Sequence, residues 1–243
     1  VFFEYSKHMV LVDYLETTGV RHAKPAFLEN FFGSLKKLEF DGAIKRDIVI
    51  PSHVLPYLKT LEELNVHSSD AAQVIFDTDD IEANTKEIIV LPFKKLTLED
   101  LPNLKCVWNK TPQGIFSFRN LEEVCVKKCR SLATLFPLSV ARNFEKLETL
   151  DIKRCDKLVE IVGKEDAMEH GTTEILAFPS LWKLLLYKLS LLSCFYPGNH
   201  QLECPELEIW DVSYCPKLKL FTSEFHNSHK EAVIEQPLFM VEK

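Results

Sequence analysis

Residues 147–161 read LETLDIKRCDKLVEI, and the apolar side chains of this stretch follow a fixed spacing. Counted from Leu147, they stand at offsets 3, 5, 8, 11 and 14. Apolar residues at offsets 3 and 5 with a polar residue between them predict a short strand, because alternate side chains of a strand point to the same side. The three-residue steps that follow do not fit this strand and predict a turning, partly helical return. One such unit cannot bury its own apolar side, whereas a stack of units can.

The same spacing recurs along the chain. Its units begin at Leu35, Leu61, Phe93, Leu121, Leu147, Leu181 and Leu207, at intervals of 26, 32, 28, 26, 34 and 26 residues. Leucine-rich repeats run about 20–29 residues and need about three units for a stable stack, so four intervals fit directly and two contain insertions. Amphipathic helices also place apolar residues three apart, but the prolines that recur around the units would break such helices. The sequence therefore predicts a leucine-rich-repeat solenoid.

We expect an α/β-type solenoid with a curved parallel sheet on its concave face and a helical or irregular convex side. Curvature follows because strands stack about 4.8 Å apart, whereas the returns need about 8–10 Å. About seven short strands are expected near residues 36–41, 62–67, 94–99, 122–127, 148–153, 182–187 and 208–213. The array would span residues 35–221 with insertions at 69–90 and 162–178, after an N-terminal flank or preceding repeat at 1–34 and before a C-terminal tail or partial cap at 222–243.

Side chains at offsets 2, 4 and 6 would point away from the core and form the exposed face of the sheet. In the last five strands these candidate recognition residues are Lys95, Thr97, Glu99, Glu123, Cys125, Lys127, Thr149, Asp151, Lys153, Lys183, Leu185, Tyr187, Ile209, Asp211 and Ser213. Most of this face is charged, but Leu185, Tyr187 and Ile209 place apolar groups where solvent is expected. Exposed apolar clusters with a polar rim often mark interaction sites. The alternative is that neighbouring side chains or the C-terminal tail cover this patch.

The charge of the chain is unevenly distributed. The net charge is −7. Residues 69–90 have a net charge of −5 and residues 160–174 a net charge of −4, so the rest of the chain has a net charge of about +2. The acidic residues therefore belong to the insertions, which are either solvated loops or attract a basic partner or neighbouring domain. No basic stripe is visible in the sequence, so we do not expect nucleic-acid binding. No apolar run approaches the roughly 18 residues of a membrane span.

The sequence lacks the patterns that would indicate catalysis or a bound ligand. The segment that begins at Asp77 resembles a calcium loop, but Glu82 and Ile88 stand where glycine and a bidentate glutamate are required. Cys125 and Cys129 should point in different directions and have no second close pair, so zinc is not expected. There is no glycine-rich phosphate loop and no nucleophile elbow. We therefore expect no enzyme activity, no metal and no cofactor in this segment.

Cysteines mark one position of the repeat. Cys129, Cys155 and Cys215 all stand at offset 8, where a small, weakly donating side chain suits the turn after the strand. The total of seven cysteines is odd, which argues for a reducing compartment. The chain begins at Val1 without a visible signal peptide and is expected to be a fragment of a longer protein. We expect a cytoplasmic or nuclear location.

Several strings resemble the cysteine-bearing repeats of plant intracellular immune receptors, the nucleotide-binding leucine-rich-repeat disease-resistance proteins of the coiled-coil class. They are Phe178-Pro-Ser-Leu181, residues 147–158 and Val212-Ser-Tyr-Cys215-Pro-Lys-Leu218. Residues 24–229 resemble the receptors of legumes, including residues 25–32 (PAFLENFF) and 101–108 (LPNLKCVW). The departures are Ala43, Ser69, Leu101 and Leu189, which replace the cysteine at offset 8 in four units.

The resemblance implies that the chain is the C-terminal leucine-rich-repeat region of such a receptor. Its partners would be a pathogen effector, a guarded host protein and, in a full-length receptor, its own nucleotide-binding domain, which the repeats help to hold inactive. ADP or ATP would bind in that domain, to which no residue here corresponds. The alternatives are the substrate-recognition arm of an F-box-type ubiquitin ligase and a general leucine-rich-repeat scaffold. An F-box upstream would favour the ligase, and a phosphate-binding loop upstream would favour the receptor.

Overall fold

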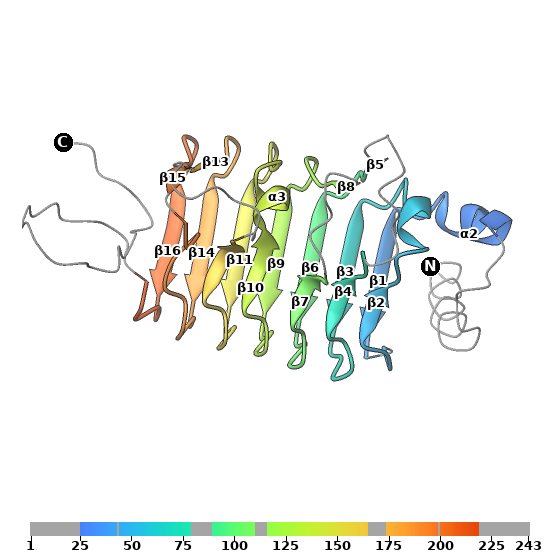
Figure 1. Cartoon of the computed structure of the whole chain (residues 1–243), viewed down its shortest axis with the longest axis horizontal. Coiled ribbons are helices and arrows are strands. Elements are labelled where there is room, and N and C mark those ends of the chain that lie inside the picture. Colours follow the sequence, from blue (N-terminus) through green and yellow to red (C-terminus); the bar gives the residue numbers. More distant parts are fainter. Residues whose placement is uncertain are drawn as a thin grey trace, which may run out of the picture.

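The chain winds into a solenoid in which each coil adds one strand to a seven-stranded parallel sheet (Figure 1). The computed structural model describes residues 25–42, 44–78, 89–109, 116–164, 174–198 and 200–218. The strands of this main sheet, in spatial order, are β1 (Lys37–Asp41), β3 (Glu63–His67), β6 (Lys95–Glu99), β9 (Glu123–Lys127), β11 (Thr149–Lys153), β14 (Lys183–Tyr187) and β16 (Ile209–Ser213). Each ends at the predicted residue and begins one residue later than predicted. The predicted parallel sheet is therefore confirmed.

Neighbouring strands of the main sheet pair offset for offset. Asp151 of β11, for example, lies opposite Cys125 of β9 and Leu185 of β14. The same register holds from β1 to β16. Parallel strands lie about 4.8 Å apart, so equivalent side chains of successive repeats are direct neighbours. The predicted columns at offsets 2, 4 and 6 consequently exist as rows across the sheet.

The return side consists mainly of turns and short parallel strands. β2 (Ile48–Ile50), β4 (Val74–Phe76) and β7 (Cys106–Trp108) form one small sheet. Three strand pairs complete this side: β10 (Thr134–Pro137) with β12 (Glu160–Gly163), β13 (Glu174–Ala177) with β15 (His200–Glu203), and β5 (Ile89–Val90) with β8 (Phe116–Ser117). Within the described ranges, helix is confined to α2 (Pro25–Phe32), η2 (Leu55–Tyr57) and α3 (Leu138–Ala141).

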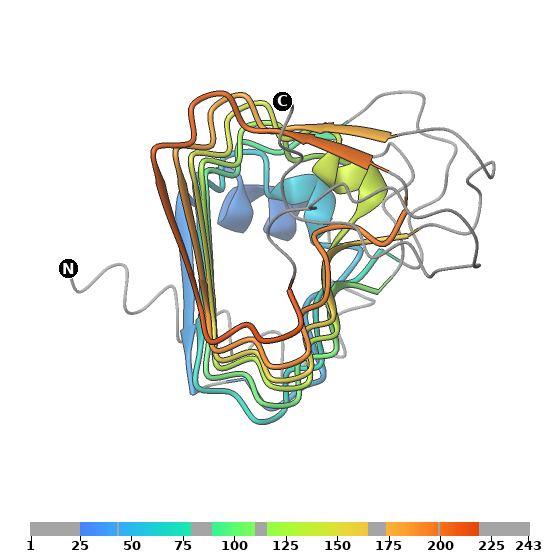
Figure 2. The same ribbon diagram turned by 90° about the vertical axis from the view of Figure 1, so that its left-hand side faces the viewer.

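The core lies between the main sheet and the returns, as the view along the stack shows (Figure 2). In the coil of β11, every apolar position of the spacing is fully buried: Leu147, Leu150, Ile152, Cys155, Leu158 and Ile161 are each 0% exposed. Turns account for the three-residue steps. Leu158 lies in a turn in which its N–H donates a hydrogen bond to Cys155 O (3.2 Å). Ile161 belongs to β12.

A row of aromatic rings also runs through the core, and the repeat spacing did not reveal it. Adjacent ring centroids are 4.8–6.2 Å apart. The rings belong to Phe76, Phe93, Trp108, Phe118, Phe136, Phe144, Phe178 and Phe195. Phe118, Phe144 and Phe178 each stand three residues before the first leucine of a unit, so the pattern Phe-x-x-Leu was the available sequence signal.

The cysteines at offset 8 are structural. The buried Cys155 thiol donates to Lys153 O (3.5 Å) and lies 3.9 Å from Val126 O of the preceding strand. Cys129 and Cys215 make the equivalent contacts in their own coils. Hydrogen bonding with Cys155 and burial raise the pKa of Cys129. These three thiols therefore connect the ends of β9, β11 and β16 to the preceding coil.

Parts of the predicted domain organisation fall outside the described residues. They are most of the N-terminal flank, the centres of both insertions (79–88 and 165–173) and the C-terminal tail with its possible cap. The predicted boundaries at 1–34, 35–221 and 222–243 stay predictions. None of the described helices is long and apolar enough to cross a membrane.

Candidate recognition surface

The outward side chains of the main sheet form one face, which we call the recognition face and which comprises offsets 2, 4 and 6 of every strand. All of the candidate residues from Lys95 to Ser213 lie on it, and none of them is buried. Their neighbours at offsets 3 and 5 point into the core, as the alternating burial of β6, β11 and β14 shows. The alternation of side chains along a strand thus separates outward positions from packing positions.

Charges on the first part of the recognition face are largely paired. Lys95 Nζ lies 2.7 Å from Glu123 Oε2 across the β6–β9 pair, and this hydrogen bond raises the pKa of Lys95. Lys37 Nζ lies 3.0 Å from Glu39 Oε2 within β1. At the start of the strands, Glu62 lies between two lysines, and hydrogen bonds from Lys94 and Lys36 lower the pKa of its carboxyl.

Apolar groups gather at the other end of the recognition face. Leu185 and Tyr187 are half-buried on β14, and Ile209 of β16 is 45% exposed. Tyr214, which follows β16, is 70% exposed, and its ring packs edge-on against Tyr187 with centroids 5.4 Å apart. The structure thus places the three predicted apolar residues on the neighbouring strands β14 and β16, and Tyr214 packs against one of them, Tyr187.

Trp210 departs from the buried position that its spacing predicts. It stands at offset 3, where Leu150 and Leu184 are 0% exposed, yet 45% of its surface is exposed. β16 is the last strand of the main sheet within the described residues, so no later described coil covers this indole. The last described coil therefore presents apolar surface on both the recognition face and the core side.

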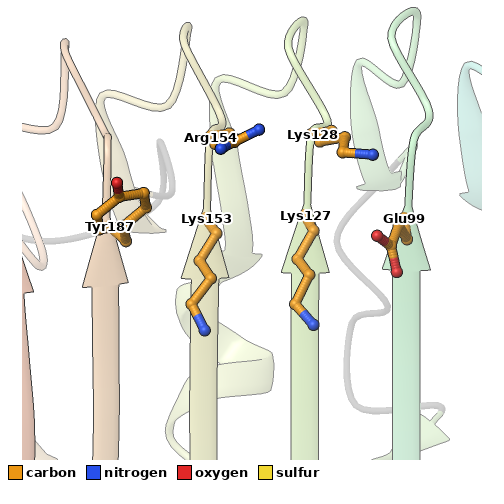
Figure 3. Close-up of a pocket in the computed structure, with 6 residues that line it drawn as sticks. All are labelled: Glu99, Lys127, Lys128, Lys153, Arg154 and Tyr187. Carbon is orange, nitrogen blue, oxygen red and sulfur yellow. The ribbon is translucent and has the colours of Figure 1, made fainter.

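Basic side chains meet at the carboxyl ends of β9 and β11. Lys127, Lys128, Lys153 and Arg154, which we call the basic edge, line a shallow hollow of about 360 Å³ together with Glu99 and Tyr187 (Figure 3). Lys127 and Lys153 lie side by side along their strands, and Lys128 and Arg154 lie just beyond the strand ends (Figure 3). The sequence shows no continuous basic stripe because these pairs are one repeat apart. The basic dipeptides at offsets 6 and 7, Lys127-Lys128 and Lys153-Arg154, are the sequence feature that could have predicted the basic edge.

A left-handed turn positions the second residue of each pair. Lys128 and Arg154 have φ angles of 56° and 57°. Their N–H groups continue the hydrogen bonding of the sheet, donating to Lys153 O and Tyr187 O at 2.9 Å. The turn therefore fixes the backbone from which both side chains leave the sheet.

The side chains of the described residues that could bind a metal or act as nucleophiles are dispersed. No group of three His, Cys, Asp or Glu side chains within them could hold a metal ion. Cys125 is half-buried on the recognition face, whereas Cys129 is buried in the core, so their thiols point to opposite sides of the sheet. Burial raises the pKa of Cys125, and because the thiolate is the reactive form of cysteine, this disfavours nucleophilic chemistry.

The buried repeat core and the outward sheet face together define a leucine-rich-repeat solenoid, a class of protein-interaction modules. The sequence model of the plant disease resistance protein RPS2-like leucine-rich repeats matches residues 5–156. The chain belongs to this family.

Two Arabidopsis thaliana proteins are similar to the chain, and both are described as disease resistance proteins. At1g61190 is 34% identical over 124 residues, which cover 48% of this chain and 12% of that protein. At4g19050 is 33% identical over 147 residues, which cover 60% of this chain and 10% of that protein. The chain thus spans about a tenth of the length of these relatives. No solved structure matches it.

Proposed function

We propose that this array is the non-catalytic recognition module of an intracellular plant immune receptor of legume type, and that its recognition face binds a pathogen effector or a guarded host protein. The observation that carries the proposal is the in-register face, whose candidate side chains are all accessible and which lies above a core that is buried from β6 to β14. Substitutions on such a face can alter binding without disturbing the packing beneath it. The relatives' description as disease resistance proteins supports the same function.

The dimensions of the recognition face set a limit on how binding occurs. Seven strands of five residues span about 16 Å by 29 Å, or roughly 460 Å² in projection. A stable protein complex buries about 800 Å² on each partner. The strand face alone is therefore too small, and a bound protein would also contact the turns at the strand ends.

The same module would contribute to autoinhibition by contacting the receptor's own nucleotide-binding domain. ADP or ATP would bind in that domain and not in this segment. The receptor would act in the cytoplasm or the nucleus. Sequencing the transcript upstream of Val1 separates this proposal from its alternative, because a phosphate-binding loop there supports the receptor and an F-box supports a ubiquitin ligase.

The apolar end of the recognition face provides the functional test. The receptor encoded by the complete transcript would be expressed in leaves with a panel of pathogen effectors, and cell death would be scored. We expect Leu185→Ser/Tyr187→Ser to abolish the response to the recognised effector at unchanged protein level. The matched control, Val159→Ser/Leu191→Ser, removes exposed apolar groups away from this face and should leave the response intact. An undiminished response in the face variant would sink the proposal.

A further inference from the structure

The basic edge joins Lys127 and Lys153 of the recognition face to Lys128 and Arg154 beyond the strand ends, and it differs from the first part of that face in how its charges are balanced. Elsewhere on the face, Lys37 and Lys95 pair with Glu39 and Glu123. At the basic edge, Lys153 pairs with Asp151 at 2.9 Å. Lys127, Lys128 and Arg154 make no ion pair with any residue that the structure describes. Cations therefore outnumber carboxylates at the basic edge of a chain whose net charge is −7.

The register adds to the electrostatic cost of this arrangement. Lys127 and Lys153 lie directly opposite each other in the β9–β11 pair. Like charges at directly opposed positions of a sheet destabilise it. Glu99, Asp100 and Asp151 are the carboxylates at adjoining positions, and they are fewer than the four cations of the basic edge. An anion placed in the hollow would balance the remaining positive charge.

We infer that the basic edge binds an acidic segment of the protein that the recognition face recognises, in an extended conformation and with an apolar residue beside its carboxylates. This inference rests on the proposed function and names the chemistry of the partner. It also supplies the contact at the strand ends that the small area of the strand face requires.

The size of the basic edge sets the length of the segment. A chain that crosses from β9 over β11 to β14 travels two strand spacings, about 10 Å, which an extended peptide covers with about three residues. Two or three carboxylates can therefore meet the four cations. Arginine and lysine at a partly exposed hollow favour such charge-assisted contacts with carboxylates.

The surroundings favour a short peptide over a nucleic acid. Glu99 borders the hollow on one side, and Glu123, Asp151 and Asp211 lie on the same face, so a continuous phosphate backbone would meet carboxylates in either direction. On the other side, Tyr187 and Tyr214 provide aromatic surface. Lys188 Nζ lies 5.4 Å and 5.7 Å from the centroids of these two rings. An apolar side chain next to the carboxylates would pack there.

A peptide titration of the intact 243-residue chain tests this inference. The probe is a fluorescein-labelled peptide of sequence Gly-Ser-Glu-Glu-Leu-Glu-Gly-Ser, and the reference replaces each glutamate with glutamine. Fluorescence anisotropy should show binding of the glutamate peptide that weakens at least fivefold between 50 and 200 mM salt, because salt screens exposed charges. The glutamine peptide should not bind.

Two variants locate the binding. Lys127→Gln/Lys128→Gln/Lys153→Gln/Arg154→Gln should weaken binding about tenfold or more, since it removes every cation of the hollow. The control variant makes four equal changes at exposed lysines outside the hollow, Lys45→Gln/Lys105→Gln/Lys146→Gln/Lys157→Gln, and should stay within twofold. If the first variant unfolds by circular dichroism, Lys128→Gln/Arg154→Gln replaces it, with an expected loss of about threefold.

The remaining outcomes overturn the inference. Equal binding of the two peptides, equal losses in the two variants, or tighter binding of a single-stranded oligonucleotide of the same charge would each do so. The leaf assay separates this inference from the proposed function. If the peptide does not bind but Leu185→Ser/Tyr187→Ser still abolishes the response, this inference alone is wrong. If the peptide binds through the basic edge, but neither Leu185→Ser/Tyr187→Ser nor the basic-edge variant alters the response in leaves, the proposed function is wrong.

Discussion

The residue that directly follows each strand of the main sheet has a positive φ angle in all seven coils. Gly42 fills this position in the first coil with a φ of 65°. The other six are not glycines and have φ angles of 53–59°: Ser68, Asp100, Lys128, Arg154, Lys188 and Tyr214. The left-handed conformation costs an L-residue about 1–2 kcal/mol, because Cβ approaches the following carbonyl oxygen. A hydrogen bond to the next strand offsets part of this cost, as Arg154 N–H does with Tyr187 O at 2.9 Å.

This conformation predicts an unusual order of stabilities at Arg154. We expect Arg154→Gly to be more stable than Arg154→Ala by about 1 kcal/mol, since both variants lose the side chain and glycine alone escapes the steric cost. Urea unfolding of the two variants gives the difference. The same comparison at Lys157, an exposed residue with no positive φ, should favour alanine. An alanine variant at position 154 as stable as the glycine variant would contradict the expected strain.

At the scale of the strand, cross-strand pairs contribute to stability on the recognition face. Lys95 and Glu123 lie directly opposite each other on β6 and β9, with Nζ and Oε2 2.7 Å apart. Opposed charges of this kind contribute about 0.2–1 kcal/mol. Arg130 and Asp156 offer a comparison, because their charged atoms are 3.9 Å apart and both side chains are more than half exposed.

A double-mutant cycle measures this difference. Lys95→Gln and Glu123→Gln, alone and combined, should show a coupling free energy of unfolding of about 0.5 kcal/mol that shrinks in 1 M salt. The equivalent cycle with Arg130→Gln and Asp156→Asn should give a coupling close to zero. Equal couplings for the two pairs would show that the register of the main sheet adds nothing to the ion pair.

The strands could be predicted from the sequence because burial imposes a two-residue period on them. Leu150 and Ile152 face the core while Asp151 faces outward. The residue at which this alternation stops predicts the end of the strand. The returns carry a three-residue spacing that turns, helices and short strands satisfy equally, so β12 and its counterparts could not be distinguished from helical pieces. The phenylalanines that precede four of the units, among them Phe118, Phe144 and Phe178, lie outside the forward spacing from the first leucine and so are not predicted by it.

The basic edge could not be read from the sequence for a different reason. Lys127-Lys128 and Lys153-Arg154 are 26 residues apart, and each pair alone has the composition of an ordinary surface. The contact between them exists only because β9 and β11 pair without a shift in register. The repeat spacing predicts which residues of successive strands are neighbours. The hollow at the strand ends also depends on the left-handed turn, and the residues at that turn in these two repeats, Lys128 and Arg154, are not of a type that predicts it.

At the scale of the whole molecule, the solenoid is a one-dimensional stack in which each coil contacts its neighbours. An interior apolar residue therefore packs against two coils, whereas a residue at the end of the described stack packs against one. Leu150 of β11 is fully buried, and Trp210 of β16 is 45% exposed although its side chain is larger.

Position in the stack should therefore outweigh side-chain size. We expect Leu150→Ala to lower the free energy of unfolding by about 2–5 kcal/mol, as for other buried leucines, and Trp210→Ala to lower it by less than about 2 kcal/mol. Chemical denaturation followed by circular dichroism compares the two variants. A larger loss for Trp210→Ala would mean that the indole is covered as completely as the interior positions.

The uninterrupted register has a consequence for how this molecule can be altered. The unit that begins at Leu61 is 32 residues long, yet Val74 still pairs with Cys106 on the return side and Glu63 with Lys95 on the main sheet. Extra residues between Thr78 and Ile89 thus leave the pairing on both sides of them intact. A reporter domain or an affinity tag could be grafted into that interval. The strands of both sheets would stay aligned, because they pair coil by coil whatever the number of residues between them.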